Sequence, residues 1–236
     1  MKTIKLLSII SMMVFTSMLY AQDEGVNTPE MISMFKSANA SSNASFGASV
    51  FFVNPKRIID GTVYLFDDWS NRGIIYTNAH EKLAINNINL NIQRNAFESK
   101  VGNDSLFSFS FNNIEKFVIN NRVFKNYYWD NDNRVYEEIA IQKNFEILKG
   151  FNVKFVEGSS NPMLNRKNDK YIRNESYYVR KDGKITFLAL KKSRILKLLD
   201  LNDQQKQKVL DYADQNKLSF KNEDDLKKIL NYASKV

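Results

Sequence analysis

Few residues of this chain could perform catalysis, and they do not form a known catalytic set. The sequence has one histidine, His80, and no cysteine. A triad of serine, histidine and carboxylate would have to use His80, and no serine stands in the G-x-S-x-G turn that exposes a nucleophile. Because His80 lies in the polar segment TNAHEK, we interpret it as an ordinary surface residue.

Acidic residues stand side by side at Asp67 and Asp68 and again at Glu137 and Glu138. Neighbours on a strand point to opposite faces of a sheet, so neither pair alone supplies the two facing carboxylates that glycoside hydrolysis uses. Carboxylates from separate strands could still meet. A hydrolase acting on an envelope polymer is therefore the alternative function.

The string DNDN at 130–133 imitates the start of a calcium-binding loop. Val135 stands where that loop needs a glycine, and Ile141 stands where it needs a glutamate. A hairpin loop accounts for the string better. A zinc site with one histidine and no cysteine would need an unusual set of three carboxylates. We therefore expect no catalytic residue, no metal site and no cofactor.

Aromatic residues give the better candidate for a binding site. They gather in YLFDDW (64–69), NYYW (126–129) and SYY (176–178). If exposed, Trp69, Tyr127, Tyr128 and Trp129 would form a platform on which sugar rings or an extended peptide stack. If buried, they would be sheet core or cross-strand pairs, which is a common use of aromatic residues in strands. On a strand, Tyr127 and Trp129 share one face and Tyr128 takes the other.

The elements that would carry these residues follow from the alternation of apolar and polar residues. In NINLNI, for example, Asn87, Asn89 and Asn91 alternate with apolar residues. Such alternation is typical of antiparallel strands with one buried face and one solvated face, so we expect the asparagines to face solvent. Asn120 with Asn121 fits a tight hairpin turn, as does the Asp-Gly pair at 182–183.

We predict an α+β fold in which residues 46–190 form an antiparallel β meander of roughly eight to ten short strands. The pattern does not decide whether this sheet stays open or is strongly curved or barrel-like. A long polar loop is expected from Gly158 to Asp169.

Residues 191–236 have helical periodicity and form a predicted C-terminal segment of two or three helices. Asn202 and Asn222 are predicted N-caps, each followed by acidic residues. The segment carries 11 Lys and Arg against 7 Asp and Glu, a net charge of +4. Its basic residues either contact an anionic membrane surface weakly or form the solvated face of a helical cap, and we favour the cap. Nucleic acid is not a favoured partner.

The N-terminal residues predict export. Lys2 and Lys5 precede an apolar run that ends at Ala21, the pattern of a signal peptide over residues 1–21 with cleavage after Ala21. Residues 22–45 read as a short helix followed by a flexible linker. We expect a periplasmic or secreted protein that, having no cysteine, is held together without disulfides. Ser105 in Asp104-Ser105-Leu106 matches a short O-glycosylation pattern of Bacteroidota.

Four stretches resemble a group of exported proteins from flavobacteria and other Bacteroidota: GTVYLFDDW (61–69), INNINLNIQRNAFESK (85–100), IEKFVINNRVFK (114–125) and FKNEDDLKKILNYASK (220–235). The resemblance covers most of the chain after the signal peptide. It implies a β-rich body with a helical C-terminal tail, and it brings no known activity or catalytic residues.

These observations favour a non-catalytic binding or scaffolding protein of the cell envelope that presents one sheet face to a protein or glycan. An open sheet face flanked by Trp69 or Trp129 would support binding. A deep cleft with two converging carboxylates would support the hydrolase.

Overall fold

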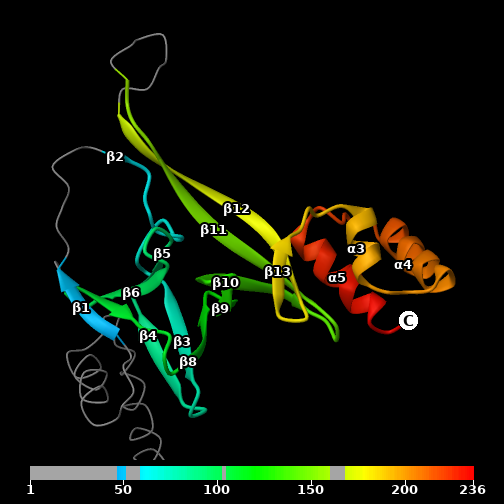
Figure 1. Ribbon diagram of the computed structural model, residues 1–236, viewed down its shortest axis with the longest axis horizontal. Coiled ribbons are helices and arrows are strands. Elements are labelled where there is room, and N and C mark those ends of the chain that lie inside the picture. The colour runs from blue at the N-terminus through cyan, green and yellow to red at the C-terminus, as the bar shows by residue number, and fades with distance from the viewer. Residues whose placement is uncertain (1–46, 52–58, 103–104, 160–167) are drawn as a thin grey trace, which may run out of the picture.

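The computed structural model describes residues 47–51, 59–102, 105–159 and 168–236, which Figure 1 draws in colour. The predicted signal peptide with Ala21 and the predicted helix and linker of residues 22–45 lie outside the described residues, as does most of the predicted loop from Gly158 to Asp169. Among the described helices, none is long and apolar enough to cross a membrane.

The described chain is mainly antiparallel β-structure followed by three helices, which confirms the predicted fold class. The smaller sheet has the strand order β1 (Gly47–Phe51), β7 (Ser105–Phe109), β6 (Ala96–Lys100), β5 (Ile88–Asn91). The longer sheet has the order β13 (Lys184–Phe187), β12 (Asp169–Lys181), β11 (Glu146–Val156), β10 (Asp132–Ile141), β9 (Arg122–Trp129), β8 (Ile114–Ile119), β3 (Arg72–Thr77), β4 (Lys82–Asn86). A short strand, β2 (Ile59–Asp60), pairs in parallel with β12.

The longer sheet is open, because within the described chain β13 and β4 each pair with one neighbour in it. Thirteen strands are described, more than the meander predicted from sequence. The additional strands include β2, which has two residues and is too short to show an alternating pattern.

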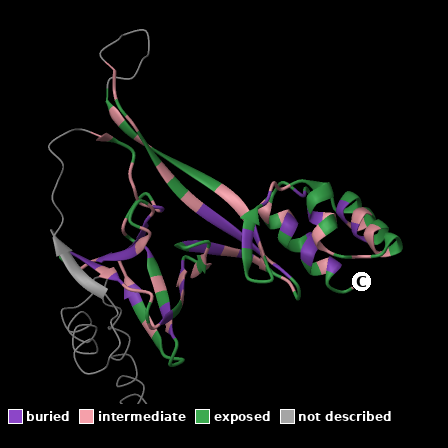
Figure 2. Cartoon of the chain, viewed as in Figure 1, coloured by how far each residue is buried: buried purple, intermediate pink, exposed green. Residues whose placement is uncertain are grey.

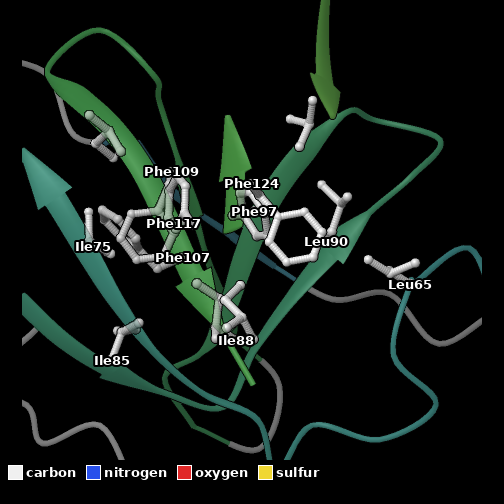
Figure 3. Close-up of a cluster of buried hydrophobic side chains, with 13 residues drawn as sticks. Leu65, Ile75, Ile85, Ile88, Leu90, Phe97, Phe107, Phe109, Phe117 and Phe124 are labelled. Carbon is white, nitrogen blue, oxygen red and sulfur yellow. The ribbon is translucent and has the colours of Figure 1, made fainter. Parts of the chain in front are cut away.

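The smaller sheet packs on the β3, β4, β8 and β9 end of the longer sheet around one hydrophobic core (Figure 3). Phe97 and Phe107 come from the smaller sheet, and Phe117 and Phe124 come from the longer sheet; all four are at most 1% exposed. The Phe97 and Phe117 rings stack with their centroids 4.1 Å apart. This aromatic core holds the two sheets together as a sandwich.

The NINLNI segment forms the corner between the two sheets. β4 ends at Asn86 in the longer sheet and β5 begins at Ile88 in the smaller one, with Asn87 between them in the left-handed region at φ 52°. Asparagine tolerates this backbone conformation better than most residues.

The prediction that the asparagines of this segment face solvent is wrong for Asn89 and Asn91, which are 0% and 4% exposed. The Asn89 side chain accepts a hydrogen bond from the Phe66 amide (3.0 Å) and donates to the carbonyls of Phe66 (2.9 Å) and Asp68 (3.0 Å). Asn91 donates to the buried carboxylate of Glu98 at 3.3 Å. One face of β5 packs in the sandwich core, and the segment that contains Phe66 covers the other face. Both faces of this strand are therefore buried.

Replacing Asn89 with leucine is expected to lower the free energy of unfolding by about 1–3 kcal/mol, because the part-buried amide and carbonyl of Phe66 lose their hydrogen bonds to the Asn89 side chain. Urea denaturation followed by circular dichroism measures the change. The matched control is Asn231→Leu on the exposed surface of a C-terminal helix, for which we expect a change within about 0.5 kcal/mol. Equal effects of the two substitutions would contradict the role given to the Asn89 amide.

The predicted hairpin turns are confirmed. Asn120 and Asn121 have φ values of 50° and 63° between β8 and β9, and Asp182 and Gly183 have 51° and 78° between β12 and β13. Successive positive φ values are typical of two-residue hairpin turns. In the calcium-like string, Asp130 and Asn131 (φ 55° and 57°) form the turn between β9 and β10. The string is therefore a hairpin turn, as predicted, with two residues between the strands.

Three helices follow the last strand: α3 (Lys192–Leu198), α4 (Asp203–Gln215) and α5 (Glu223–Ala233). The predicted N-caps are confirmed, since the Asn202 side chain accepts from the Gln205 amide and the Asn222 side chain from the Asp225 amide. The helices form a second core with strands β10 to β12 and with Leu188, which follows β13; Ile195, Val209 and Ile229 in this core are fully buried.

The smaller sheet and the helices cover the same face of the longer sheet. Phe124, Glu137, Lys149 and Tyr177 stand directly opposite one another on β9, β10, β11 and β12 and so point to one side. Phe124 belongs to the sandwich core, and Tyr177 packs against the helical core. We call this side the inner face and the opposite side the outer face. Figure 1 shows the sandwich and the helices as two bodies joined by β10, β11 and β12.

Candidate ligand-binding surface on the outer face

A row of aromatic side chains crosses the outer face from β9 to β13. Its members are Tyr127, Tyr136, Tyr178 and Phe187. Successive ring centroids are 6.1 Å, 5.4 Å and 6.2 Å apart, and each pair meets edge to face. Strand pairing fixes this geometry, because Tyr178 is opposite Phe187 and Tyr136 is opposite Gly150.

Gly150 on β11 lets the two central tyrosines meet. A Cβ atom at this position would lie 2.8 Å from Cε2 of Tyr178 and 3.0 Å from Cε1 of Tyr136. The two rings therefore lean over the bare backbone of β11 from the strands on either side. Glycine inside a strand often marks such a close approach.

The row has a buried floor and an open top. Tyr136, Leu148 and Ile185 are 8%, 0% and 7% exposed and form a small cluster of their own. Tyr127, Trp129 and Tyr178 pack on this cluster and are half-buried, whereas Phe187 is 68% exposed. In the described chain, the smaller sheet and the helices both lie on the other face of this sheet, so the outer face is open.

The charges beside the row neutralise one another. The Tyr127 hydroxyl lies 2.8 Å from Glu138 and 3.1 Å from Glu146. Lys125 pairs with Glu138 at 3.0 Å, and Arg180 pairs with Glu146 at 3.1 Å and stacks on the Tyr127 ring at 5.0 Å. Burial, together with the hydrogen bonds and the negative charges of the two glutamates, raises the pKa of Tyr127 well above its ordinary value. The hydroxyl therefore stays protonated and donates to the carboxylates.

The structure brings only two of the four predicted platform residues together. Trp129 and Tyr127 lie on the outer face, as the strand alternation predicts. Tyr128 points to the other side and is 70% exposed, with its hydroxyl 3.0 Å from Asn131. Trp69 lies on the sandwich, where it packs edge to face on Tyr64 (4.7 Å) and under the Lys100 ammonium (4.9 Å). Trp69 is therefore not part of this surface.

Sequence reasoning did not select Tyr136, Tyr178 or Phe187 as platform residues, although Tyr178 belongs to the noted SYY stretch. Their grouping depends on strand register across four strands. Gly150 inside a strand-like segment was the one local signal that aromatic side chains approach the backbone there.

The other predicted candidates lie apart from this surface. His80 is exposed in the turn between β3 and β4. Ser105 is the half-buried first residue of β7, and Asp104 of its glycosylation pattern lies outside the described residues. Glu137 and Glu138 point to opposite faces, as expected for neighbours on a strand. No group of three or more potential metal ligands occurs in the described part of the chain.

A network of charged residues, of which Glu137 and Lys149 are buried, occupies the inner face between the two cores. Arg122 donates to both carboxylate oxygens of Glu137, at 2.9 Å and 2.7 Å. Lys149 lies 3.6 Å from Glu137 and forms an ion pair with Glu223, the first residue of α5. The Tyr177 hydroxyl donates to Glu223 at 3.1 Å. The network joins the sandwich end of the sheet to the helical end.

The Glu223 carboxylate makes this junction sensitive to acid. Burial alone would raise its pKa, but hydrogen bonds from Lys149 and Lys227 lower it below the ordinary value of 4.5. A carboxylate whose pKa is lowered in the folded state stabilises the fold at pH values above its ordinary pKa. This contribution is lost as the pH falls through the lowered pKa. We expect Glu223→Gln to be less stable than the parent at pH 7 and the difference to shrink as the pH falls below 4.5. Urea midpoints measured across this range test the expectation, and a difference independent of pH would contradict it.

Comparisons of the chain with protein-family models, with curated proteins and with solved structures found no match. The resemblance to exported proteins of Bacteroidota therefore stays a prediction.

Proposed function

We propose that this chain is an exported, non-catalytic binding protein of the cell envelope that takes up a glycan chain on its outer face. The observation that carries the proposal is the aromatic row Tyr127, Tyr136, Tyr178 and Phe187, with Trp129 beside it, on a sheet face that the described chain leaves open.

The shape and charge of the surface favour a neutral polymer over other ligands. Small ligands are usually enclosed in concave pockets, whereas this row runs over an open sheet. Lys125 and Arg180 are paired with Glu138 and Glu146, so no charge is left in this group to attract an ionic partner. Tyrosine and tryptophan rings offer apolar faces and polar edges, which suit sugar rings. An extended peptide would bind along a sheet edge such as β13, whereas the aromatic row lies across the sheet face.

Glu138 and Glu146 also give the hydrolase alternative a specific observation, since these carboxylates come from separate strands and approach one hydroxyl. Each is already neutralised by a cation, and a protonated tyrosine lies between them. A glycosidase needs one carboxyl group free to donate a proton and access to the sugar bond. We therefore rank the hydrolase below the binding protein as the proposed function. Release of reducing ends from any bound glycan would favour it.

Export remains part of the proposal and is supported by the charged, apolar and small residues of positions 1–21. For the membrane-surface contact, Ile195 of α3 is fully buried in the helical core, and Leu198 and Leu199 pack against it. Such a contact would therefore use the exposed basic residues of α3 without an apolar helix face.

The binding experiment compares variants by co-sedimentation with insoluble chitin, cellulose, mannan and peptidoglycan. For the polymer that the parent protein binds, Tyr178→Ala is expected to weaken binding about tenfold, the effect of losing one aromatic contact. Tyr128→Ala is the matched control, because that tyrosine is exposed on the other face, and it should leave binding unchanged. Circular dichroism confirms that both variants are folded. Binding to none of the polymers, or equal loss in both variants, would contradict the proposal.

A further inference from the structure

A concave site lies at the junction of the last strand and the first C-terminal helix, next to the Phe187 end of the aromatic row. It has a volume of about 450 Å³, which is within the range of small-molecule sites. Its walls come from the end of β12, from β13 and from α3. Figure 1 shows β13 leading directly into α3 at this point.

The floor of this groove is apolar and its rim is cationic. Val179 and Leu188 are 8% and 5% exposed and form part of the floor. Lys181, Arg194 and Lys197 line the groove with exposed side chains from two different elements. Cations converge here because Lys181 is at the end of β12, while Arg194 and Lys197 are three residues apart and so lie on one face of α3.

These three cations have no acidic partner within ion-pair distance among the residues that the structure describes. Other lysines and arginines on the same sheet behave differently, since Lys125, Lys149 and Arg180 are all paired with glutamates. Residues 181–197 contain six Lys and Arg and one Asp, a net charge of +5. The groove therefore has a strongly positive local field above an apolar floor.

We propose that this groove binds a single-chain anionic amphiphile, with its carboxylate or phosphate head between Lys181, Arg194 and Lys197 and its hydrocarbon chain over Val179 and Leu188. Arginine and lysine donate charge-assisted hydrogen bonds to such heads. The apolar floor selects against an anion without a chain, and the three cations select against a neutral amphiphile. Phe187 of the aromatic row also lines this groove, whereas Tyr127, Tyr136 and Tyr178 do not, so the two sites adjoin at β13.

The test titrates the protein, by isothermal calorimetry below the critical micelle concentrations, with dodecyl phosphate, dodecanoate, dodecyl maltoside and inorganic phosphate. We expect both anionic amphiphiles to bind one site and the maltoside and inorganic phosphate to bind far more weakly. Preference between the two anionic probes distinguishes a phosphate head from a carboxylate head. Failure of both anionic amphiphiles to bind, or equally strong binding of dodecyl maltoside or inorganic phosphate, would overturn the proposal.

The double variant Arg194→Gln/Lys197→Gln removes two cations from the rim, and each loss is expected to weaken binding about tenfold. The matched control is Lys191→Gln/Lys192→Gln, which removes the same charge from exposed residues that do not line the groove. Equal loss in both double variants would show general attraction to the basic segment and overturn the proposal. Flotation with phosphatidylglycerol vesicles without binding of free amphiphile would also overturn it, in favour of a membrane surface.

Discussion

Replacing Glu137 with alanine is expected to lower the free energy of unfolding by about 3–5 kcal/mol, the usual cost of removing one partner from a buried ion pair. The Glu137 side chain is 5% exposed, and it accepts two hydrogen bonds from Arg122 and lies beside Lys149. Without it, the Arg122 guanidinium stays between the Phe66, Phe124 and Phe151 rings with no anion at its end. Urea denaturation followed by circular dichroism and by tryptophan fluorescence measures the loss.

Two controls separate the buried charge from the loss of a side chain. Glu115→Ala removes a glutamate from the exposed pair with Lys116 and should change stability by less than about 1 kcal/mol. The double variant Arg122→Met/Glu137→Leu removes both charges and should be more stable than Glu137→Ala, since no cation is left unpaired at Arg122. A loss below about 1 kcal/mol in Glu137→Ala would mean that the network does not stabilise the junction.

Replacing Phe97 with alanine is expected to lower the free energy of unfolding by about 3–5 kcal/mol, because the substitution leaves a cavity between the two sheets. Phe97 is 0% exposed and touches three other rings of the sandwich core, Phe111, Phe117 and Phe124. Phe117 and Phe124 are held in the paired strands β8 and β9, so these rings cannot move inward freely to fill the space. Thermal and urea unfolding of the variant measure the cost.

The control for this substitution is Phe155→Ala. Phe155 is 42% exposed on β11 and makes its ring contact with Tyr171 on the neighbouring strand. We expect a change of at most about 1 kcal/mol at this site. Equal losses in the free energy of unfolding for the two substitutions would contradict the conclusion that the sandwich core stabilises the fold.

Features that depend on neighbouring residues could be predicted from the sequence. The N-caps Asn202 and Asn222 and the hairpin turns at 120–121 and 182–183 have the predicted positions, because caps and turns are determined by a few adjacent residues. The opposite directions of Glu137 and Glu138 follow from the two-residue period of a strand in the same way.

Features that depend on distant segments could not be predicted. Asn89 and Asn91 have the alternation of a solvated face, yet both are buried. A segment more than twenty residues earlier in the chain bonds the Asn89 amide, and Glu98 on the next strand accepts from the Asn91 amide. Local periodicity shows which residues share a face but not what packs on that face. The pairing of Arg122 with Glu137 and of Lys149 with Glu223 is likewise a result of register and helix docking.

The same distinction applies to the candidate site. Tyr127 and Trp129 could be assigned to one face because they are two residues apart, and the structure places both on the outer face. Trp69 could not be separated from them by sequence, because its position depends on how residues 64–70 cross the smaller sheet. Tyr136 and Tyr178 meet only because Gly150 lies between them in the strand register.

The central claim is that the outer face beside Trp129 binds a glycan, and a single-tryptophan titration tests it most directly. The chain has two tryptophans, so Trp69→Phe leaves Trp129 as the only one and Trp129→Phe leaves Trp69. With soluble oligosaccharides of the polymer that co-sediments with the protein, we predict a saturable change in the Trp129 emission and no change in the Trp69 emission. Unchanged Trp129 emission while the oligosaccharide binds, or a response from Trp69 alone, would contradict the assignment of this face as the binding surface.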